Sequence, residues 1–423
     1  MEKTAAVSLT EAYTHPVRDV LWGHIYMTEK QAQLTETAPF MRLTRIMQLG
    51  PVYHVYPGAT HTRFSHSIGV YHLGRRLLLN LTQRGVSWLS PEGVKSFLAA
   101  CLLHDLGHFP YTHSLKELPL SSHESLTGLI ILKEPMKSLV GNTGADPVFT
   151  AAIVDKEMSG DNDELLFYRK LLSGALDPDK LDYLNRDARY CGVPYGAQDV
   201  DFIFSRLHPD KERGVDIDSR LIPNVESILF SKYLMYRTVY WHRQVRAGTA
   251  MVKKAIINAL ESGLILSEDL YDLDDTGLFS LLAKNSAEGS LVESVKEGRI
   301  FSCIAEISPE NVKMAAIREI SGRAQTEERL AAKLRQSGSG NLGEIRGEDI
   351  IIDIPEEQSF ETGLYVTDEK CKFSESSSAF KPETVNAFIK TLYTIRVFIN
   401  QKYKETLKTF PLIYDIIKEE LEA

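Results

Sequence analysis

LLHDLGHFPYTH, residues 102–113, is the most informative segment of the chain. It overlaps an apolar stretch over 92–106 that is typical of a buried core helix. Gly107 and then Pro110 are stop signals, so the adjacent pair His104-Asp105 is predicted at the C-terminal end of that helix. Neighbouring side chains on a helix diverge by about 100°. The pair can therefore bind one ion only where both curl toward a shared cavity, which a helix end beside a glycine allows.

Helical patterns continue on both sides of this segment. From about residue 30 to residue 260, apolar positions recur three and four apart between short breaks marked by Gly or Pro. Thr62, the Ser121-Ser122 pair and Pro178 are suitable start signals, and Gly263 is a suitable stop. We therefore expect helices over 62–82, from about 123 onward, over 179–188 and over 225–260.

The composition changes after about residue 300. Short β-branched runs, RIFSCIAEI, EDIIIDIP and GLYVTD, are separated by a helical pattern over 326–336 and by SGSGNLG at 337–343, which we interpret as a mobile loop. The predicted fold is mainly α. A helical domain spans residues 1–300, and a smaller α+β subdomain spans residues 301–423.

The composition of the 423-residue chain excludes several classes of protein. It is 43% hydrophobic and 25% charged, which excludes overall disorder, and its net charge of −9 makes nucleic acid an unlikely partner. The four cysteines form no CxxC pair, which argues against a disulfide framework or a thiolate zinc site. No segment approaches membrane-spanning length, and the first residues lack a signal-peptide pattern. We expect a cytoplasmic protein without a membrane partner.

One group of residues stands out as a candidate metal site. It comprises His66, the pair His104-Asp105 and the acidic segment DPDKLD at 177–182. Two imidazoles and two carboxylates suit a divalent ion such as Mn, Fe, Zn, Ni or Mg, which can activate water. The alternative is structural, because a buried histidine is often a hydrogen-bonded core residue and an aspartate before Pro178 is often a helix cap. Spacing alone does not choose among the three aspartates of 177–182.

Four strings in this order resemble the HD-domain phosphohydrolases. They are QLGPVYHVYPGATHTRFSHSIGVYHLG (48–74), LLHDLGHFPYTH (102–113), HE (123–124) and DPDKLDYLNRD (177–187). The resemblance covers about residues 15–250 and is greatest to the branch of the SAM-and-HD-domain deoxynucleoside triphosphate triphosphohydrolase and its bacterial relatives. It implies a helical HD-domain core whose metal ligands are His66, His104, Asp105 and Asp179. The implied reaction converts a dNTP to deoxynucleoside and tripolyphosphate.

The resemblance also implies roles around the substrate. It assigns Gln48 and Asp187 to the sugar 3′-hydroxyl, Arg63, Lys180 and Tyr183 to the phosphates, His108 to the α-phosphate, His113 to protonation of the leaving 5′-oxygen, and His123 with Glu124 to a supporting pair. These residue types suit the task, since cations and phenols stabilise phosphate charge while an amide and a carboxylate read hydroxyl groups. By residue type alone, Arg63 and Lys180 would more often be solvated surface charges, but the position of both cations inside the metal-ligand strings favours the functional role.

Two departures from the family leave questions open. The family usually has an acidic residue three positions after the proton-donating histidine, where this chain has Lys116; Glu117 could orient His113 if the segment is helical. Relatives form dimers and tetramers, which predicts a homo-oligomer here. Their allosteric nucleotide site uses an aspartate, matched by Asp19, and an arginine, replaced by Thr44 between Arg42 and Arg45.

Three functional interpretations therefore remain. The leading one is a dNTP triphosphohydrolase. The second keeps the same site but takes another nucleotide, such as a mono- or diphosphate or an alarmone. The third is a non-catalytic nucleotide sensor, which Lys116 favours. A basic and aromatic stretch over 236–246 fits a phosphate contact, a subunit interface or an interhelical ion-pair face.

Overall fold

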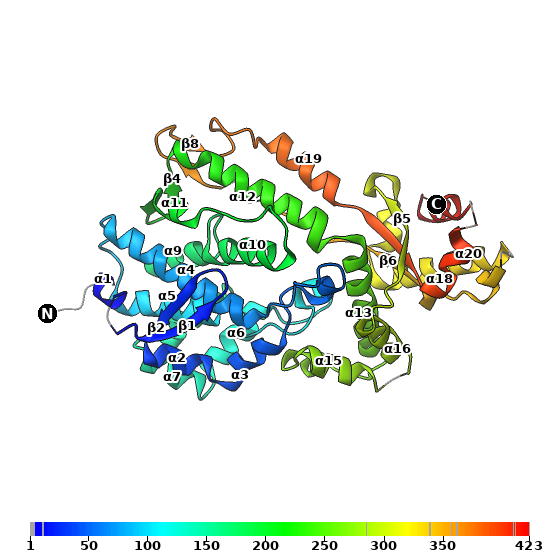
Figure 1. The fold of residues 1–423 in the computed structure, drawn as a ribbon, viewed down its shortest axis with the longest axis horizontal. Helices are drawn as coiled ribbons and strands as arrows, with labels where there is room; N and C mark the ends of the chain where they lie inside the picture. The colour runs from blue at the N-terminus through cyan, green and yellow to red at the C-terminus, as the bar shows by residue number, and fades with distance from the viewer. Residues whose placement is uncertain are drawn as a thin grey trace.

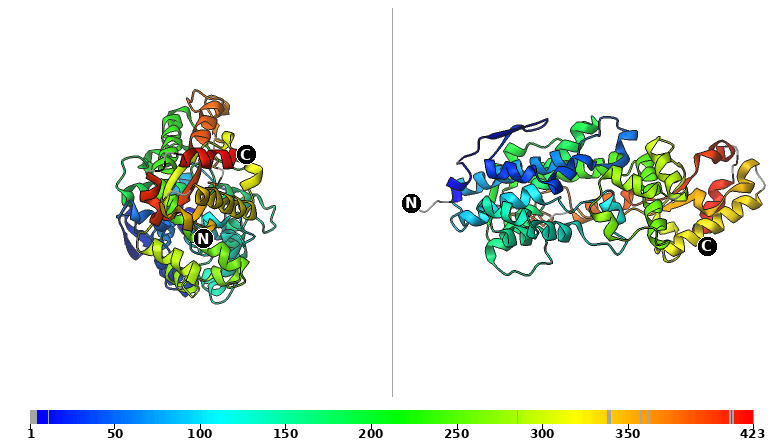
Figure 2. Two further views of the ribbon diagram at one scale, coloured as in Figure 1. Left: turned by 90° about the vertical axis from the view of Figure 1, so that its right-hand side faces the viewer. Right: turned by 90° about the horizontal axis from the view of Figure 1, so that it is seen from below.

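The chain folds mainly into helices, as predicted (Figure 1). This computed structural model describes residues 5–10, 12–284, 286–337, 340–356, 358–360, 363–408, 410 and 412–422. The two termini lie at opposite ends of an elongated molecule, and the small sheet near the C-terminus is far from the N-terminal hairpin (Figure 2). Within the described ranges, no helix combines the length and the apolar character needed to cross a membrane.

The larger part is a helical body that begins with a short helix and a β-hairpin. Its elements are α1 (Ala5–Ser8), β1 (His15–Asp19), β2 (Gly23–Met27), α2 (Glu29–Thr35), α3 (Ala38–Arg42), α4 (Arg63–Gln83), α5 (Pro91–Leu103), α6 (His123–Leu132), α7 (Met136–Asn142), α8 (Pro147–Val154), α9 (Asp163–Leu172), α10 (Pro178–Cys191), α11 (Val200–Phe204), β3 (Leu207–Asp210), β4 (Gly214–Ile217), α12 (Ile222–Met235) and α13 (Arg243–Glu261).

Side-chain caps set the start of the helices that carry the predicted site. Ser90 accepts from the Gly93 amide before α5, Ser122 from the Ser125 amide before α6, and Asp177 from the Lys180 amide before α10. Thr62 precedes α4 in extended conformation, but its side chain makes no capping bond there. The helix starts predicted at Thr62, at Ser121-Ser122 and at Pro178 are therefore confirmed, although Thr62 occupies the N-cap position of α4 without a side-chain capping bond.

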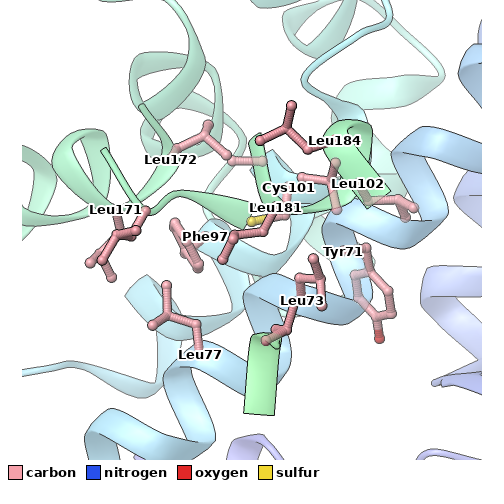
Figure 3. Close-up of a cluster of buried hydrophobic side chains, with 14 of the residues drawn as sticks. Tyr71, Leu73, Leu77, Phe97, Cys101, Leu102, Leu171, Leu172, Leu181 and Leu184 are labelled. Carbon is pink, nitrogen blue, oxygen red and sulfur yellow. The ribbon is translucent and has the colours of Figure 1, made fainter. Parts of the chain in front are cut away.

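The core of this body lies between α4, α5 and α10. Tyr71 and Leu77 of α4 meet Phe97 and Cys101 of α5, and leucines of α9 and α10 cover them (Figure 3). Gly74 permits the close approach of α4 to α5, since a Cβ there would lie 2.5 Å from Cys101 Sγ. This packing brings the start of α4, the end of α5 and the start of α10 to one place.

The single helix predicted over 225–260 is wrong, because the segment is interrupted. It consists of α12, a π-helical turn over Tyr236–Tyr240, and α13. The β-branched and aromatic sequence TVYW disfavours a continuous α-helix. His242 then caps the new helix by accepting from the Gln244 amide. Gly263 lies just beyond α13 at a φ of 69°, as expected of a helix stop.

The C-terminal part contains a three-stranded antiparallel sheet, in the order β5-β9-β6. Ile351 of β6 pairs with Phe398 of β9, and Cys303 of β5 pairs with the same residue from the other side. The elements of this part are α14 (Glu268–Tyr271), α15 (Asp275–Leu282), α16 (Ser286–Lys296), β5 (Ser302–Ile307), α17 (Met314–Ile317), α18 (Ile320–Gln336), β6 (Ile350–Asp353), β7 (Tyr365–Val366), β8 (Cys371–Lys372), α19 (Pro382–Leu392), β9 (Ile395–Ile399), α20 (Lys404–Lys408) and α21 (Ile413–Glu422).

The strand predicted in GLYVTD does not join that sheet. It forms β7, which pairs with β4 of the helical body in the sheet β3-β4-β7-β8, and Phe360 and Val385 pack in the core of that body. The chain thus crosses back over the predicted boundary, and the division into 1–300 and 301–423 stays a prediction. In the loop expected at 337–343, residues 338–339 lie outside the described residues, and Gly340–Glu344 form a 3-10 turn.

Candidate active site

Three helices bring the predicted metal ligands together. His66 lies on α4, the pair His104-Asp105 follows α5, and Asp179 lies in the first turn of α10. Single ligand atoms of His66, His104 and Asp105 all lie within 4.8 Å of one another. Asp179 Oδ1 lies 2.9 Å from His66 Nε2 and 3.9 Å from His104 Nε2. Residues 113 positions apart in the sequence thus form one cluster.

The donor set fits a divalent cation. His104 Nδ1 lies 3.0 Å from the Cys101 carbonyl oxygen, which turns Nε2 toward the cluster. That Nε2 is buried and has no hydrogen-bond partner among the described residues. A buried polar atom without a partner is costly, and an ion bound by the cluster would satisfy it. Two imidazoles and two carboxylates match a borderline to hard metal rather than a soft one.

The charges around the cluster favour a bound cation. Burial alone would lower the pKa of His66, but its hydrogen bonds to Asp179 and Asp182 raise that pKa to about 10. Burial would raise the pKa of Asp105, yet His108, His104 and Arg63 hold it well below its usual value. Burial would also raise the pKa values of Asp179 and Asp182, but His66 beside both and Arg186 beside Asp182 lower them, so these carboxylates are ionised at neutral pH. They hold a proton on His66 that a metal ion would have to displace.

Three histidines form a second cluster beside the first. The ring of His108 stacks on that of His123 at 3.9 Å and meets that of His113 edge-on at 4.8 Å. His108 Nε2 also lies 3.1 Å from Asp105 Oδ1. Burial and the nearby Arg63 hold the pKa values of His108 and His113 well below the usual range. These imidazoles are thus neutral at neutral pH.

The pair predicted between His123 and Glu124 is present, with 3.1 Å between Nδ1 and Oε2. The predicted contact by which Glu117 would orient His113 is not present. The 3-10 helix η3 (Thr112–Leu115) ends before Glu117, whose carboxylate instead binds Lys253 at 2.6 Å and Arg323 at 2.7 Å. That hypothesis is wrong because the segment does not continue as an α-helix.

The residues expected on the phosphates have distinct surroundings. Arg63 is buried and donates from Nη1 to Asp105 at 2.8 Å, while its Nε has no hydrogen-bond partner in the described part of the chain. Lys180 Nζ donates to Asp177 Oδ2 at 2.7 Å and to the Gly174 carbonyl at 2.9 Å. Asp177 is therefore the helix cap that the structural alternative predicted. Burial raises the pKa of Tyr183 well above its usual value.

The two residues expected at the sugar meet around His61. The Asp187 carboxylate accepts from His61 Nε2 at 2.8 Å and from the Tyr240 hydroxyl at 2.6 Å. The backbone N–H of Gln48 donates to the backbone carbonyl of His61 at 3.1 Å. Gln48 Oε1 is buried and makes no hydrogen bond to any described residue. Sequence reasoning missed His61 and Tyr240. His61 was indicated only by its position within THTRFSH, and Tyr240 only by its place in the basic and aromatic stretch over 236–246.

Other highlighted residues have structural roles. Arg42 is buried and donates to the carbonyls of Leu106 and His108, at 2.6 and 2.8 Å. Thr44, at the position that departs from the family, donates to the Met41 carbonyl at 2.6 Å. In the basic and aromatic stretch, Arg246 of α13 is buried and pairs at 2.6 Å with Asp353 of β6, so this ion pair joins a helix to a strand and not two helices as the ion-pair alternative predicted.

Comparisons with known proteins identify two matching family models. The HD domain model matches residues 63–143, and the HD associated region model matches residues 203–411. The chain is 34% identical over 240 residues to an uncharacterised protein of Mycoplasma pneumoniae, the MG461 homolog, covering 53% of this chain and 55% of that protein. It is 24% identical over 277 residues to the bovine deoxynucleoside triphosphate triphosphohydrolase SAMHD1, covering 57% and 47%.

A solved structure has the same fold. A phosphohydrolase from Bacteroides thetaiotaomicron matches with a TM-score of 0.72 at 23% identity, covering 92% of this chain and all of that one. The chain spans about half the length of the curated relatives described above. Together with the histidine-aspartate cluster, the matches show that the chain belongs to the HD-domain phosphohydrolase superfamily.

Proposed function

We propose that this protein is a metal-dependent nucleotide phosphohydrolase that converts a dNTP to deoxynucleoside and tripolyphosphate. The observation that carries the proposal is the convergence of ligand atoms from His66, His104 and Asp105 within 4.8 Å. Asp179 beside them completes a four-residue set. The similarity to a relative that is named a dNTP triphosphohydrolase supports this choice of substrate.

In this proposal His66, His104, Asp105 and Asp179 hold a divalent ion, which when bound lowers the pKa of a water molecule and polarises a phosphoryl oxygen. The chain itself supplies the phosphate contacts. The Nε of Arg63 is an N–H donor that a phosphate oxygen would satisfy, and the buried Nδ1 of His108 becomes a second donor once the bound phosphates raise the pKa of this imidazole and protonate it. Neither atom has a hydrogen-bond partner among the residues described.

Proton delivery falls to His113. Water oxygen attacks the α-phosphorus and loses one proton to solvent, the bond from phosphorus to the 5′-oxygen breaks, and the imidazolium gives its proton to that oxygen. Burial and Arg63 hold the pKa of His113 low. The negative phosphates of a bound nucleotide raise it, so the histidine gains its proton when substrate arrives. Gln48 and Asp187 orient the sugar, with His61 and Tyr240 holding Asp187 in place.

A panel of dNTPs, incubated with the protein and Mn²⁺ or Mg²⁺, tests the proposal. We expect deoxynucleoside and tripolyphosphate in equal amounts. The His104→Ala variant should give neither, and an exposed-site variant such as Asp163→Ala should match the wild type. Turnover of other phosphoesters with every dNTP left intact would reject the proposed substrate.

A second candidate keeps the metal site but takes a nucleotide with fewer phosphates, or an alarmone. The observation in its favour is that Lys180, expected on the phosphates, donates to Asp177 and to the Gly174 carbonyl. A shorter phosphate chain needs fewer cations. Release of orthophosphate in place of tripolyphosphate would favour this candidate, and nucleotide binding without turnover would favour a sensor.

Two further predictions concern assembly and location. A homo-oligomer, dimer or tetramer, is tested by light scattering, and a cytoplasmic location is tested by cell fractionation.

A further inference from the structure

The carboxylate of Asp182 lies behind the candidate metal site and is fully buried. Its Oδ2 lies 2.8 Å from His66 Nδ1 and accepts from Arg186 Nε at 2.8 Å. Its Oδ1 accepts from Arg186 Nη2 at 2.9 Å and from the indole Nε1 of Trp22 at 2.7 Å. An ionised carboxylate only accepts, so Nδ1 of His66 carries the proton and donates it to Asp182.

These bonds extend to the turn of the N-terminal hairpin. Arg186 Nη1 donates to Asp19 Oδ2 at 2.8 Å. Asp19 Oδ1 in turn accepts from the backbone amides of Leu21 and Trp22, at 2.8 and 3.0 Å. The turn between β1 and β2 is therefore fixed to α10 by two side chains, Asp19 and Trp22. Both reach the carboxylate that faces His66, one through Arg186 and one directly.

The surface of α4 leaves room for this arrangement only at a glycine. Gly69 lies one turn after His66, and a Cβ built at Gly69 would overlap both Asp182 Oδ1 and Arg186 Nη2. The overlap is with atoms of a buried ion pair, which have no free space into which to move. The helix that carries His66 is thus shaped to seat the Asp182 carboxylate against it.

We infer that Trp22 and Asp19 are positioning residues for the metal site. They hold Asp182 in the orientation that accepts from His66 Nδ1–H, which leaves Nε2 facing the other ligands. A carboxylate behind a ligating histidine fixes its tautomer and ring orientation, and loss of such a partner typically costs about 10–100-fold in metal affinity. The inference rests on the proposed function, because it assigns the hairpin a role toward the ion that His66 would hold.

A purely structural role of the hairpin would lead to a different outcome. If Trp22 and Asp19 only fasten the N-terminus to α10, their loss lowers the midpoint of thermal unfolding but leaves Mn²⁺ affinity unchanged. If they position Asp182, Mn²⁺ affinity falls in protein that is still folded at the temperature of the measurement. The two roles are separated by measuring binding and unfolding on the same samples.

The experiment compares Trp22→Phe and Asp19→Asn with Trp88→Phe in the full chain. Trp88 is a matched control, since its indole Nε1 has no hydrogen-bond partner among the described residues and its ring packs edge-on against Phe167. Calorimetric titration with Mn²⁺ should show an affinity about tenfold weaker in Trp22→Phe and Asp19→Asn. The affinity of Trp88→Phe should stay within about twofold of the wild type.

A second readout needs no metal. In metal-free protein with ¹⁵N-labelled histidine, the Nδ1–H signal of His66 should be present in the wild type and in Trp88→Phe, and shifted or broadened in Trp22→Phe. An unchanged signal together with unchanged Mn²⁺ affinity would overturn the inference. Wild-type protein that binds no Mn²⁺ would overturn the proposed function instead, and the His66 signal would still decide whether the hairpin positions this imidazole.

Discussion

The site has two halves in which histidines meet opposite surroundings. His66 lies between Asp179 and Asp182, which raise its pKa to about 10. His108 and His113 lie in a buried group beside Arg63, and their pKa values are held well below the usual range. The comparison shows that the neighbouring groups determine the pKa of an imidazole and therefore its charge at neutral pH. In the function that we propose, the carboxylate half holds a cation and the imidazole half meets the negative charge of a phosphate.

Asp105 connects the two halves. Its Oδ1 lies 3.3 Å from His104 Nε2 and 3.1 Å from His108 Nε2, while its Oδ2 accepts from Arg63 at 2.8 Å. The same carboxylate thus faces the other predicted metal ligands, the group of three histidines and the buried guanidinium of Arg63. Substituting Asp105 therefore tests whether the two halves work as one site.

The largest effect is expected for Asp105→Asn. The neutral amide weakens the cation site and leaves the buried charge of Arg63 without its partner. We expect turnover to fall by about 10³-fold, as when a group that stabilises charge in the transition state is lost. Steady-state kinetics with a saturating dNTP measures it. The control is Asp163→Asn, at an exposed pair with Lys211, and activity retained in Asp105→Asn would mean that the halves are not coupled.

His113→Ala probes the imidazole half alone. General acid catalysis contributes at least about 10²-fold to the rate of a chemical step, and we expect a loss of about 10²-fold here, smaller than in Asp105→Asn. Mn²⁺ affinity should not change, because the ring of His113 contacts His108 and His123 rather than the metal cluster. A substrate with a better leaving group should recover most of the lost rate. Equal losses on both substrates would argue against proton delivery by His113.

The carboxylate half predicts a pH dependence of metal binding. Metal must displace a proton from His66, whose pKa is about 10 in the metal-free protein. With one proton released per ion, Mn²⁺ affinity should rise about tenfold per pH unit from about pH 6.5 toward pH 9. Titration calorimetry in buffers of different ionisation enthalpy measures both affinity and proton release. An affinity that does not change over this range would contradict the assignment of His66.

The same shift has a consequence for stability. A pKa of His66 raised above its ordinary 6.5 stabilises the folded, metal-free protein fully below about pH 6.5. That contribution is lost as the pH rises through about 10. The free energy of unfolding of metal-free protein, measured in urea, should therefore fall over this interval. A His66→Gln variant should show a smaller fall, and an equal fall in both proteins would exclude His66 as the cause.

The smallest effect on catalysis is expected for Glu117→Gln. Its carboxylate binds Lys253 and Arg323 and makes no contact with His113. We expect turnover within about twofold of the wild type and a loss of about 1 kcal/mol in unfolding free energy, as for a partly exposed ion pair. A loss of activity comparable with that of His113→Ala would restore Glu117 as the partner of this histidine.

The local signals in the sequence predicted the helices that build the site. Ser122 and Asp177, which the sequence indicated at helix starts, act as caps, and α5 ends at Leu103, just before the end at 106 that the sequence predicted. These features depend on neighbours within one or two turns. The π-helical turn over Tyr236–Tyr240 and the return of β7 to β4 depend on tertiary packing between distant segments, so periodicity did not indicate them.

For the site, the resemblance named four ligands that lie in one cluster in the structure, but it did not indicate the hydrogen-bond partners of the site residues. Asp182 was one of three aspartates that spacing left equivalent, and its role depends on Trp22 and Arg186 from other parts of the chain. The bonds of Asp187 to His61 and Tyr240 also join distant segments. Such contacts follow from the fold, which is why one sequence did not reveal them.

The central claim is that His66, His104, Asp105 and Asp179 hold one divalent ion. The most direct test is anomalous diffraction from crystals of the protein grown with Mn²⁺. We expect an anomalous peak among His66 Nε2, His104 Nε2 and the carboxylates of Asp105 and Asp179, and no such peak in crystals of Asp105→Ala. A map without a peak there at saturating Mn²⁺, or with the ion bound elsewhere, would contradict it.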